Sequence, residues 1–172
     1  EGIDIHKVAE SPPKSGFKAP SWLTLHDYQE EAIKAWLKNR GKGIFAMATG
    51  SGKTLTALSL ACRVARKNTP IPCFEGRQRW ESLLTEAYQS ISAGLESSVA
   101  LVTTNRTFQS PAFQSQLRIR VRSQHHLIIA DEVHNLGAAR IHKYLPDEIR
   151  LRVGLSATPE RHMDEEGTQA LF

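Results

Sequence analysis

The residues best suited to chemistry form a glycine-rich turn at positions 49–54, Thr-Gly-Ser-Gly-Lys-Thr. The turn follows a short apolar run, 43–46, and opens a run of helix-favouring residues, 55–66. Backbone N–H groups of such a turn, with the positive end of the helix dipole, create a site for an anion. A lysine there can neutralise phosphate charge, and a threonine hydroxyl can ligate Mg²⁺. An ordinary glycine turn before a helix is the alternative. The predicted phosphate-binding residues are Thr49, Gly50, Ser51, Gly52, Lys53 and Thr54.

Two adjacent carboxylates, Asp131 and Glu132, follow a second apolar run at 126–130. Such a run predicts a buried parallel strand, and open α/β sheets bind their ligands at the carboxyl ends of their strands. We expect Asp131 to hold Mg²⁺ together with Thr54, and Glu132 to orient and deprotonate an attacking water. Alternatively, the two acids are a solvated pair at the end of a strand.

A third apolar segment, 151–155, ends in the small hydroxyl residues Ser156 and Thr158, and Pro159 prevents easy continuation of a strand. Taken alone, these hydroxyls could simply cap a turn.

Helices and further strands must position these groups. Apolar residues at helical spacing predict a helix from about 23 to 40, with Thr24 or Asp27 as its cap and Gly41 ending it. A second helix is predicted at 80–95, and residues 99–105 predict a strand that runs into a polar turn. This alternation predicts an α/β fold.

The ordered motifs resemble the first lobe of a superfamily 2 helicase or translocase, over about residues 22–172. The motifs that carry the resemblance are Tyr-Gln at 28–29, the turn at 47–54, Asp-Glu-Val-His at 131–134 and Ser-Ala-Thr-Pro at 156–159. They are closer to the XPB, UvrB and type I and III restriction motors than to DEAD-box RNA helicases. They also resemble motors of bacterial restriction or phage-defence systems.

The resemblance implies a RecA-like P-loop NTPase lobe, with a mostly parallel sheet and helices on both faces. It implies ATP and Mg²⁺ as cofactors, with Lys53 and Glu132 as catalytic residues. Gln29 would contact adenine, although a solvated helix glutamine is the alternative. Relatives commonly carry Arg at the position of His26, so the charge contact of that Arg is not carried over to residue 26.

The resemblance also assigns residues beyond the nucleotide site. His134, Ser156 and Thr158 would couple the nucleotide to the nucleic-acid path. Thr103, Thr104 and Asn105 would contact a nucleic-acid backbone, with turn capping as an equal alternative. The expected partner is DNA, with RNA as the alternative. The parent chain would carry a second RecA-like lobe, which supplies arginine fingers, and a nuclease domain or subunit is a further expected partner.

Residues 1–21 are expected to be a linker or the end of an upstream domain, and 22–172 the lobe itself. Residues 67–78 contain two prolines and no run of five or six apolar residues, so no strand is predicted there. A lobe of this type needs a strand at this place. We therefore expect a segment to be missing near residues 70–71.

Composition is consistent with one soluble, cytoplasmic domain. The chain has 172 residues, 40% of them hydrophobic, a net charge of +4 and no apolar run of membrane-spanning length. The two cysteines, Cys62 and Cys73, fit neither a disulfide framework nor a zinc site and are expected to be inert thiols. The densest basic cluster is Arg118, Arg120 and Arg122, for which a solvated helix end or edge strand is favoured over a phosphate-binding surface.

The sequence therefore predicts the ATP-binding lobe of a nucleic-acid-dependent ATPase that translocates on or unwinds DNA, in restriction or defence. Without its second lobe, such a lobe would hydrolyse ATP very slowly. The competing hypothesis is a nucleotide-responsive binding module without turnover. A P-loop kinase or GTPase fits the second and third motifs poorly.

Overall fold

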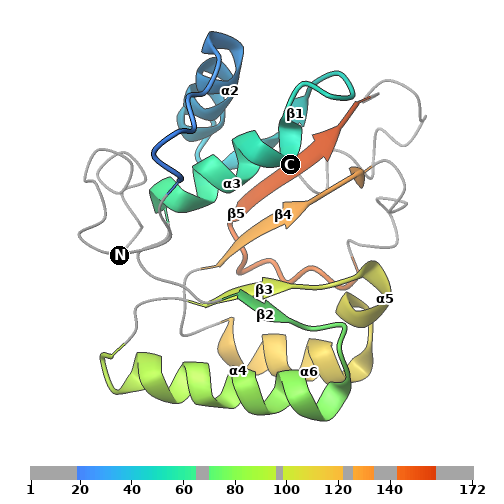
Figure 1. Ribbon diagram of the computed structural model, residues 1–172. Coiled ribbons are helices and arrows are strands. Elements are labelled where there is room, and N and C mark those ends of the chain that lie inside the picture. Colours follow the sequence, from blue (N-terminus) through green and yellow to red (C-terminus); the bar gives the residue numbers. More distant parts are fainter. Residues whose placement is uncertain (1–18, 65–69, 96–98, 122–125, 134–142, 158–172) are drawn as a thin grey trace.

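The computed structural model describes residues 19–64, 70–95, 99–121, 126–133 and 143–157. In these ranges, helices and strands alternate from the first helix to the third strand, as the sequence predicted, and two helices and two strands follow (Figure 1). In chain order the elements are α2 (Asp27–Lys38), β1 (Lys42–Ala46), α3 (Lys53–Val64), β2 (Pro70–Pro72), α4 (Arg77–Ser92), β3 (Ala100–Val102), α5 (Asn105–Phe108), α6 (Pro111–Arg120), β4 (Leu127–Ala130) and β5 (Leu151–Ser156).

The strands that precede the three predicted motifs form one parallel sheet in the order β1-β5-β4. Ala46 of β1 is in register with Ser156 of β5, and Ala130 of β4 is in register with Gly154. The carboxyl ends of all three strands therefore meet at one edge, which is where the phosphate turn and the two carboxylates begin. A second pair of parallel strands, β2 and β3, lies beside this sheet (Figure 1).

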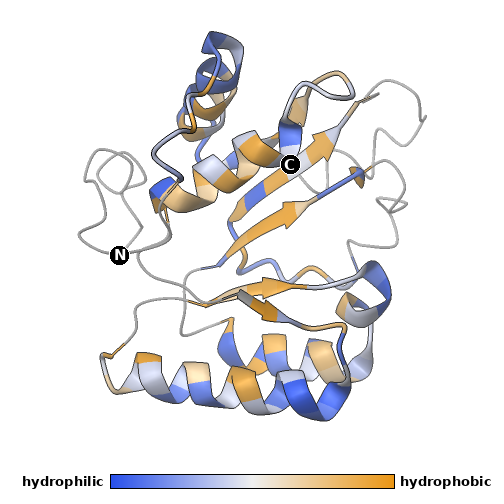
Figure 2. Cartoon of the chain, in the orientation of Figure 1, coloured by the Kyte–Doolittle hydropathy of each residue, from blue (hydrophilic) through white to orange (hydrophobic). Residues whose placement is uncertain are grey.

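Helices cover both faces of the sheet, as predicted, and β4 shows why. Successive side chains of a strand point to opposite faces. Leu127 and Ile129 pack against a core formed by α2, α3, β1 and β5, whereas Ile128 and Ala130 pack against a core that includes residues of β2, α4, α5 and α6. Both faces of the strand are therefore apolar, and Figure 2 shows β3, β4 and β5 as largely hydrophobic ribbons between the helices.

The prediction that no strand lies between residues 67 and 78 is wrong. Pro70–Pro72 forms β2, which pairs with β3 in parallel, and the Cys73 N–H continues the pairing by donating to the Val102 carbonyl at 2.8 Å. Backbone nitrogens along a strand point alternately to its two sides. Because the nitrogen of residue 73 points towards β3, the nitrogens of residues 70 and 72 point away from it. Two prolines are therefore tolerated at the edge of a sheet. The missing segment stays a prediction.

Several predicted boundaries shift. The N-cap of α2 is His26 rather than Thr24 or Asp27, and its N–H donates to Gln29 Oε1 at 2.9 Å. The second helix, α4, begins at Arg77, before the predicted residue 80. Over residues 99–105 the structure agrees with the prediction of a strand that runs into a polar segment, because β3 ends at Val102 and Thr104 caps α5. For α6, only its basic end was anticipated, as a solvated helix end or edge strand. Its N-cap is Ser110, and the next residue is Pro111, which is tolerated because a backbone N–H in the first helical turn has no intrahelical partner.

Both cysteines are buried free thiols, and burial raises the pKa of Cys73 to about 11. This environment agrees with the predicted inertness, because the thiolate is the reactive form.

None of the helices in the described ranges combines the length and the hydrophobicity needed to cross a bilayer.

Trp36 packs α2 against the sheet, and its replacement should measurably destabilise the fold. Its side chain is 2% exposed, and its indole N–H donates to the Arg152 carbonyl in β5 at 2.7 Å. Trp36→Phe removes this donor and leaves a void, so we expect a loss of about 2 kcal/mol in the free energy of unfolding. Urea denaturation checks this, with Trp22→Phe as the matched control because Trp22 is 75% exposed. Equal stability of the two variants would contradict the prediction.

Candidate active site

The phosphate turn occupies the expected place between β1 and α3. The Met47 N–H donates to the Ser156 carbonyl at 3.0 Å, which ties the start of the turn to β5. At the other end, the Gly52 carbonyl accepts bonds from both the N–H and the hydroxyl of Thr56, so it begins the hydrogen-bonded ladder of α3. Gly50 and Gly52 have φ angles of +80° and +82°, which favour glycine. The sequence-predicted turn is therefore a strand-to-helix connection anchored at both ends.

Lys53 lies inside this turn. Its side chain is 8% exposed, and Nζ donates to the Ala48 carbonyl at 3.3 Å. The Ser51 hydroxyl donates to the same carbonyl at 2.7 Å, and the Ser51 N–H does so at 3.2 Å. The ammonium group is thus held within the turn, next to the N-terminus of α3. That arrangement suits a ligand carrying several negative charges.

The structure brings Thr54 and Asp131 together, although 77 positions separate them. Thr54 Oγ1 donates to Asp131 Oδ2 at 3.3 Å, and Asp131 Oδ1 accepts the Glu132 N–H at 2.9 Å. Both Thr54 and Asp131 are exposed to solvent. Hydroxyl and carboxylate oxygens are hard ligands that suit Mg²⁺, which commonly takes one or two protein ligands and completes its shell with water and phosphate. Among the described residues there is no cluster of three His, Cys, Asp or Glu side chains that could hold a metal alone.

Glu132 has an unusual backbone conformation at the end of β4. Its φ is +48°, in the left-handed region that non-glycine residues rarely adopt, and its side chain is exposed. Such conformations cost energy and persist where the surroundings enforce them, frequently at functional sites. The Asp131 carboxylate that accepts the Glu132 N–H is one such restraint.

Two side chains from the first turn of α2 reach the phosphate turn. Gln29 is 3% exposed; its Oε1 accepts the His26 N–H, and its Nε2 donates to the Ser51 carbonyl at 3.1 Å. The Tyr28 hydroxyl donates to the same carbonyl at 2.8 Å. Tyr28 is one of the apolar residues at helical spacing from which the helix over residues 23–40 was predicted, but its side chain is 46% exposed. Sequence reasoning thus overlooked Tyr28 as a site residue, although its place beside Gln29 was a signal. Adenine contact by Gln29 stays a prediction.

The other predicted residues are only partly brought to this site. Ser156 is buried at the end of β5, next to the turn, whereas His134 and Thr158 lie outside the described residues. Thr103, Thr104 and Asn105 follow β3, which runs towards the same side of the molecule as β4 and β5 (Figure 1). Thr104 caps α5 by accepting the Thr107 N–H at 3.2 Å, which confirms turn capping for this residue. A nucleic-acid contact by these residues stays a prediction.

The basic cluster is part of a helix end, as favoured from the sequence. Arg118 and Arg120 lie in the last turn of α6, while Arg122 is outside the described ranges.

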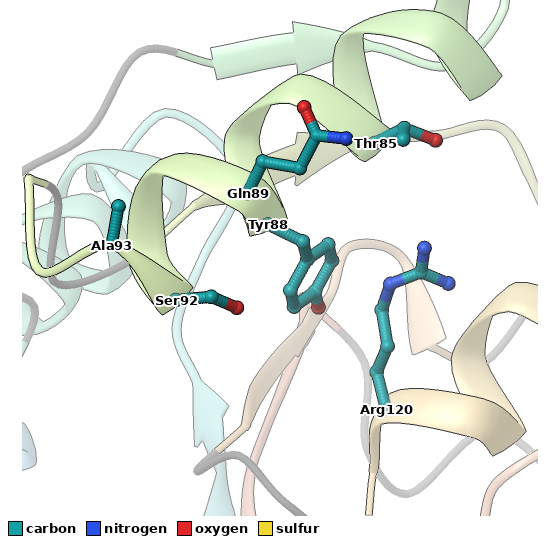
Figure 3. Close-up of a pocket in the computed structure, with 6 residues that line it drawn as sticks. All are labelled: Thr85, Tyr88, Gln89, Ser92, Ala93 and Arg120. Carbon is teal, nitrogen blue, oxygen red and sulfur yellow. The ribbon is translucent and has the colours of Figure 1, made fainter.

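The Arg120 guanidinium lies 4.4 Å from the centre of the Tyr88 ring, beside a shallow hollow of about 530 Å³ between α4 and α6 (Figure 3). Burial raises the pKa of Tyr88, an effect that the nearby Arg120 charge partly opposes. None of the residues lining this hollow belongs to the candidate active site.

The family model described as "Type III restriction enzyme, res subunit" matches residues 23–74 and 73–161. The chain belongs to this family. The matched ranges contain the phosphate turn, the two carboxylates, and the hydroxyl residues Ser156 and Thr158. Family membership and the parallel sheet together confirm the predicted superfamily 2 lobe and its RecA-like fold.

Two curated proteins are similar to this family member. The DNA 3′-5′ translocase XPB2 of Sulfurisphaera tokodaii is 32% identical over 158 residues, which cover 87% of this chain and 34% of the relative. Rad25 of Haloarcula marismortui, described as a candidate DNA 3′-5′ helicase, is 28% identical over 152 residues, which cover 84% of this chain and 24% of the relative. The chain thus spans about a third or a quarter of the length of these relatives.

Proposed function

We propose that this chain is the ATP-binding lobe of a DNA-dependent ATPase that translocates along or unwinds DNA. The observation that carries the proposal is the 3.3 Å contact between Thr54 Oγ1 and Asp131 Oδ2. It joins a phosphate-binding turn to a carboxylate at the edge where parallel α/β sheets bind ligands. The names of the two relatives, a DNA translocase and a candidate DNA helicase, support DNA as the partner.

Each residue of the site has a role in this proposal. The backbone of residues 50–53 would bind the phosphates of ATP, and Lys53 would neutralise part of their charge. Thr54 and Asp131 would hold Mg²⁺, which when bound stabilises negative charge that develops on the phosphates. Glu132 would orient the attacking water and accept its proton. Its place directly after Asp131 would keep this base next to the metal ligand.

Three groups would connect this chemistry to DNA. His134, Ser156 and Thr158 would transmit the nucleotide state, and the Met47–Ser156 hydrogen bond supports the place of Ser156 in that path. Thr103, Thr104 and Asn105 would contact the DNA backbone. A second RecA-like lobe would supply an arginine finger, which contributes about three to five orders of magnitude in rate. The whole protein would act in restriction or defence, with a nuclease domain or subunit as partner. The family's description, which names a restriction enzyme, supports the restriction role.

The proposal is tested by phosphate release from ATP by the intact protein, with and without DNA. We expect duplex or single-stranded DNA to raise the rate at least tenfold, and RNA to have less effect. Nucleotide binding without phosphate release under any of these conditions would contradict the ATPase and favour a nucleotide-responsive binding module. Failure to bind nucleotide at all would contradict both.

Thr54→Ala should raise the Mg²⁺ concentration needed for half-maximal ATP hydrolysis about tenfold or more, because it removes a metal ligand. Thr54 is exposed, so the fold should keep its stability. Thr85→Ala is the matched control, since Thr85 is an exposed threonine of α4. A Mg²⁺ titration of the ATPase rate checks this. If the two variants respond to Mg²⁺ alike, Thr54 does not hold the metal.

A further inference from the structure

Tyr28 is a side chain next to the active site that the proposed roles leave unused. Its hydroxyl and the Gln29 amide donate to one carbonyl oxygen of the phosphate turn, that of Ser51, at 2.8 and 3.1 Å. We propose that Tyr28 is a positioning residue that orients the Ser51–Gly52 peptide group for phosphate binding. This inference rests on the proposed function, because it assigns a task within the same nucleotide site.

The geometry of the peptide group explains how a bond to a carbonyl can orient a donor. A trans peptide group is planar, and its C=O and N–H bonds point in opposite directions. The described part of the chain contains no cis peptide bond. The Ser51 carbonyl points towards the side chains of α2, so the N–H of Gly52, in the same peptide group, points away from them. Gly52 directly precedes α3, where N–H groups have no intrahelical partner and suit an anion.

The turn is held from two sides at Ser51. On one side, the Ser51 N–H and hydroxyl donate to the Ala48 carbonyl, at 3.2 and 2.7 Å. On the other side, the Ser51 carbonyl accepts from Tyr28 and Gln29. The first set of bonds lies within the turn, whereas the second comes from α2. Removing one of the α2 donors therefore loosens the peptide group without removing the internal bonds of the turn.

Close packing at Gly52 shows that α2 and the turn leave little space between them. A Cβ atom at this position would lie 2.7 Å from Gln29 Nε2, and the φ of +82° itself favours glycine. The Gln29 amide therefore packs closely against the Ser51–Gly52 peptide group, whose carbonyl also accepts the Tyr28 hydroxyl. Gln29 is buried and carries a second predicted role, so the exposed Tyr28 hydroxyl is the group that can be removed cleanly.

Tyr28→Phe isolates the hydroxyl. The Tyr28 ring stacks on the His26 ring, with centroids 5.5 Å apart and planes 9° apart, and phenylalanine can keep this stack. Loss of one hydrogen bond of this kind should weaken phosphate binding roughly threefold to tenfold. Since the change affects the phosphate end, ADP and inorganic tripolyphosphate should lose affinity by the same factor. Adenosine, which carries no phosphate, should bind as before.

The experiment measures the Kd of ADP, tripolyphosphate and adenosine for the intact protein and its Tyr28→Phe variant, with Tyr88→Phe as the control. Tyr88 lies on α4, among the residues of the hollow in Figure 3 and outside the active site. We expect KM for ATP to rise by the same factor as the Kd of tripolyphosphate, with kcat and Tm unchanged. A lower Tm with unchanged Kd values would show a structural role only and overturn the proposal.

Two other outcomes are also decisive. Unchanged binding of all three ligands, or weaker binding of adenosine alone, would overturn the assignment of Tyr28 while leaving the proposed function in place. If the wild-type protein bound neither ADP nor tripolyphosphate, the proposed function itself would fail, and this inference with it. The wild-type measurement therefore separates the two failures.

Discussion

Glu132→Gln is expected to lower kcat for ATP hydrolysis about a thousandfold and to change the affinity for ATP less than threefold. The amide keeps the size of the side chain but cannot accept a proton from water, and a general base contributes about 10²- to 10⁴-fold. Because Glu132 is exposed, the substitution should not disturb the core. Single-turnover hydrolysis and equilibrium binding of ATP by the intact protein check the two halves of this prediction.

Glu31→Gln provides the matched control, because Glu31 is an exposed glutamate of α2. It should leave both kcat and affinity unchanged. Glu132→Gln with a rate within tenfold of the wild type would exclude Glu132 as the general base. A loss of affinity as large as the loss of rate would instead indicate a role in holding the nucleotide.

Lys53→Ala should abolish measurable turnover and weaken ATP binding about 10- to 100-fold. The substitution removes a positive charge that is 8% exposed, and hydrogen bonds to charged groups are stronger than neutral ones. The lost bond from Nζ to the Ala48 carbonyl is long, at 3.3 Å, so the fold should suffer little. Calorimetric titration with ATP measures the affinity, and thermal unfolding confirms that the variant folds.

Lys34→Ala is the control for a general loss of positive charge, since Lys34 is exposed on α2. We expect it to bind ATP like the wild type. ATP turnover by Lys53→Ala above a tenth of the wild-type rate would be incompatible with the role assigned to this lysine.

The local parts of the site could be predicted from the sequence alone. Lys53 and Thr54 follow from a glycine turn between an apolar run and a helix, because such a turn depends on neighbouring residues only. Asp131 and Glu132 follow in the same way from the end of an apolar strand. The family resemblance rested on these motifs, and the family match confirms it. Such motifs can be recognised in a sequence because glycine, lysine and paired carboxylates, at a fixed spacing along the chain, serve a specific chemical role.

The edge strand and the short helices were harder to predict. β2 has three residues, two of them prolines, and it is stabilised by pairing with β3 and by the burial of Ile71 and Cys73. The residues that pair with β2 are distant in sequence, so the local sequence pattern does not predict the strand. Likewise, α6 is recognisable mainly from its Ser110 cap and Pro111, since its buried residues, Phe113 and Gln114, are adjacent rather than at helical spacing.

Which of these chemical groups lie in contact depends on the packing of the whole fold. The strand order β1-β5-β4 places β5 between the strand that precedes Lys53 and Thr54 and the strand that precedes Asp131, and it brings Thr54 within 3.3 Å of that carboxylate. The contact of Tyr28 with Ser51 likewise depends on how α2 packs beside α3. The sequence therefore determined which groups are present, whereas burial of two apolar cores against one sheet determined their distances.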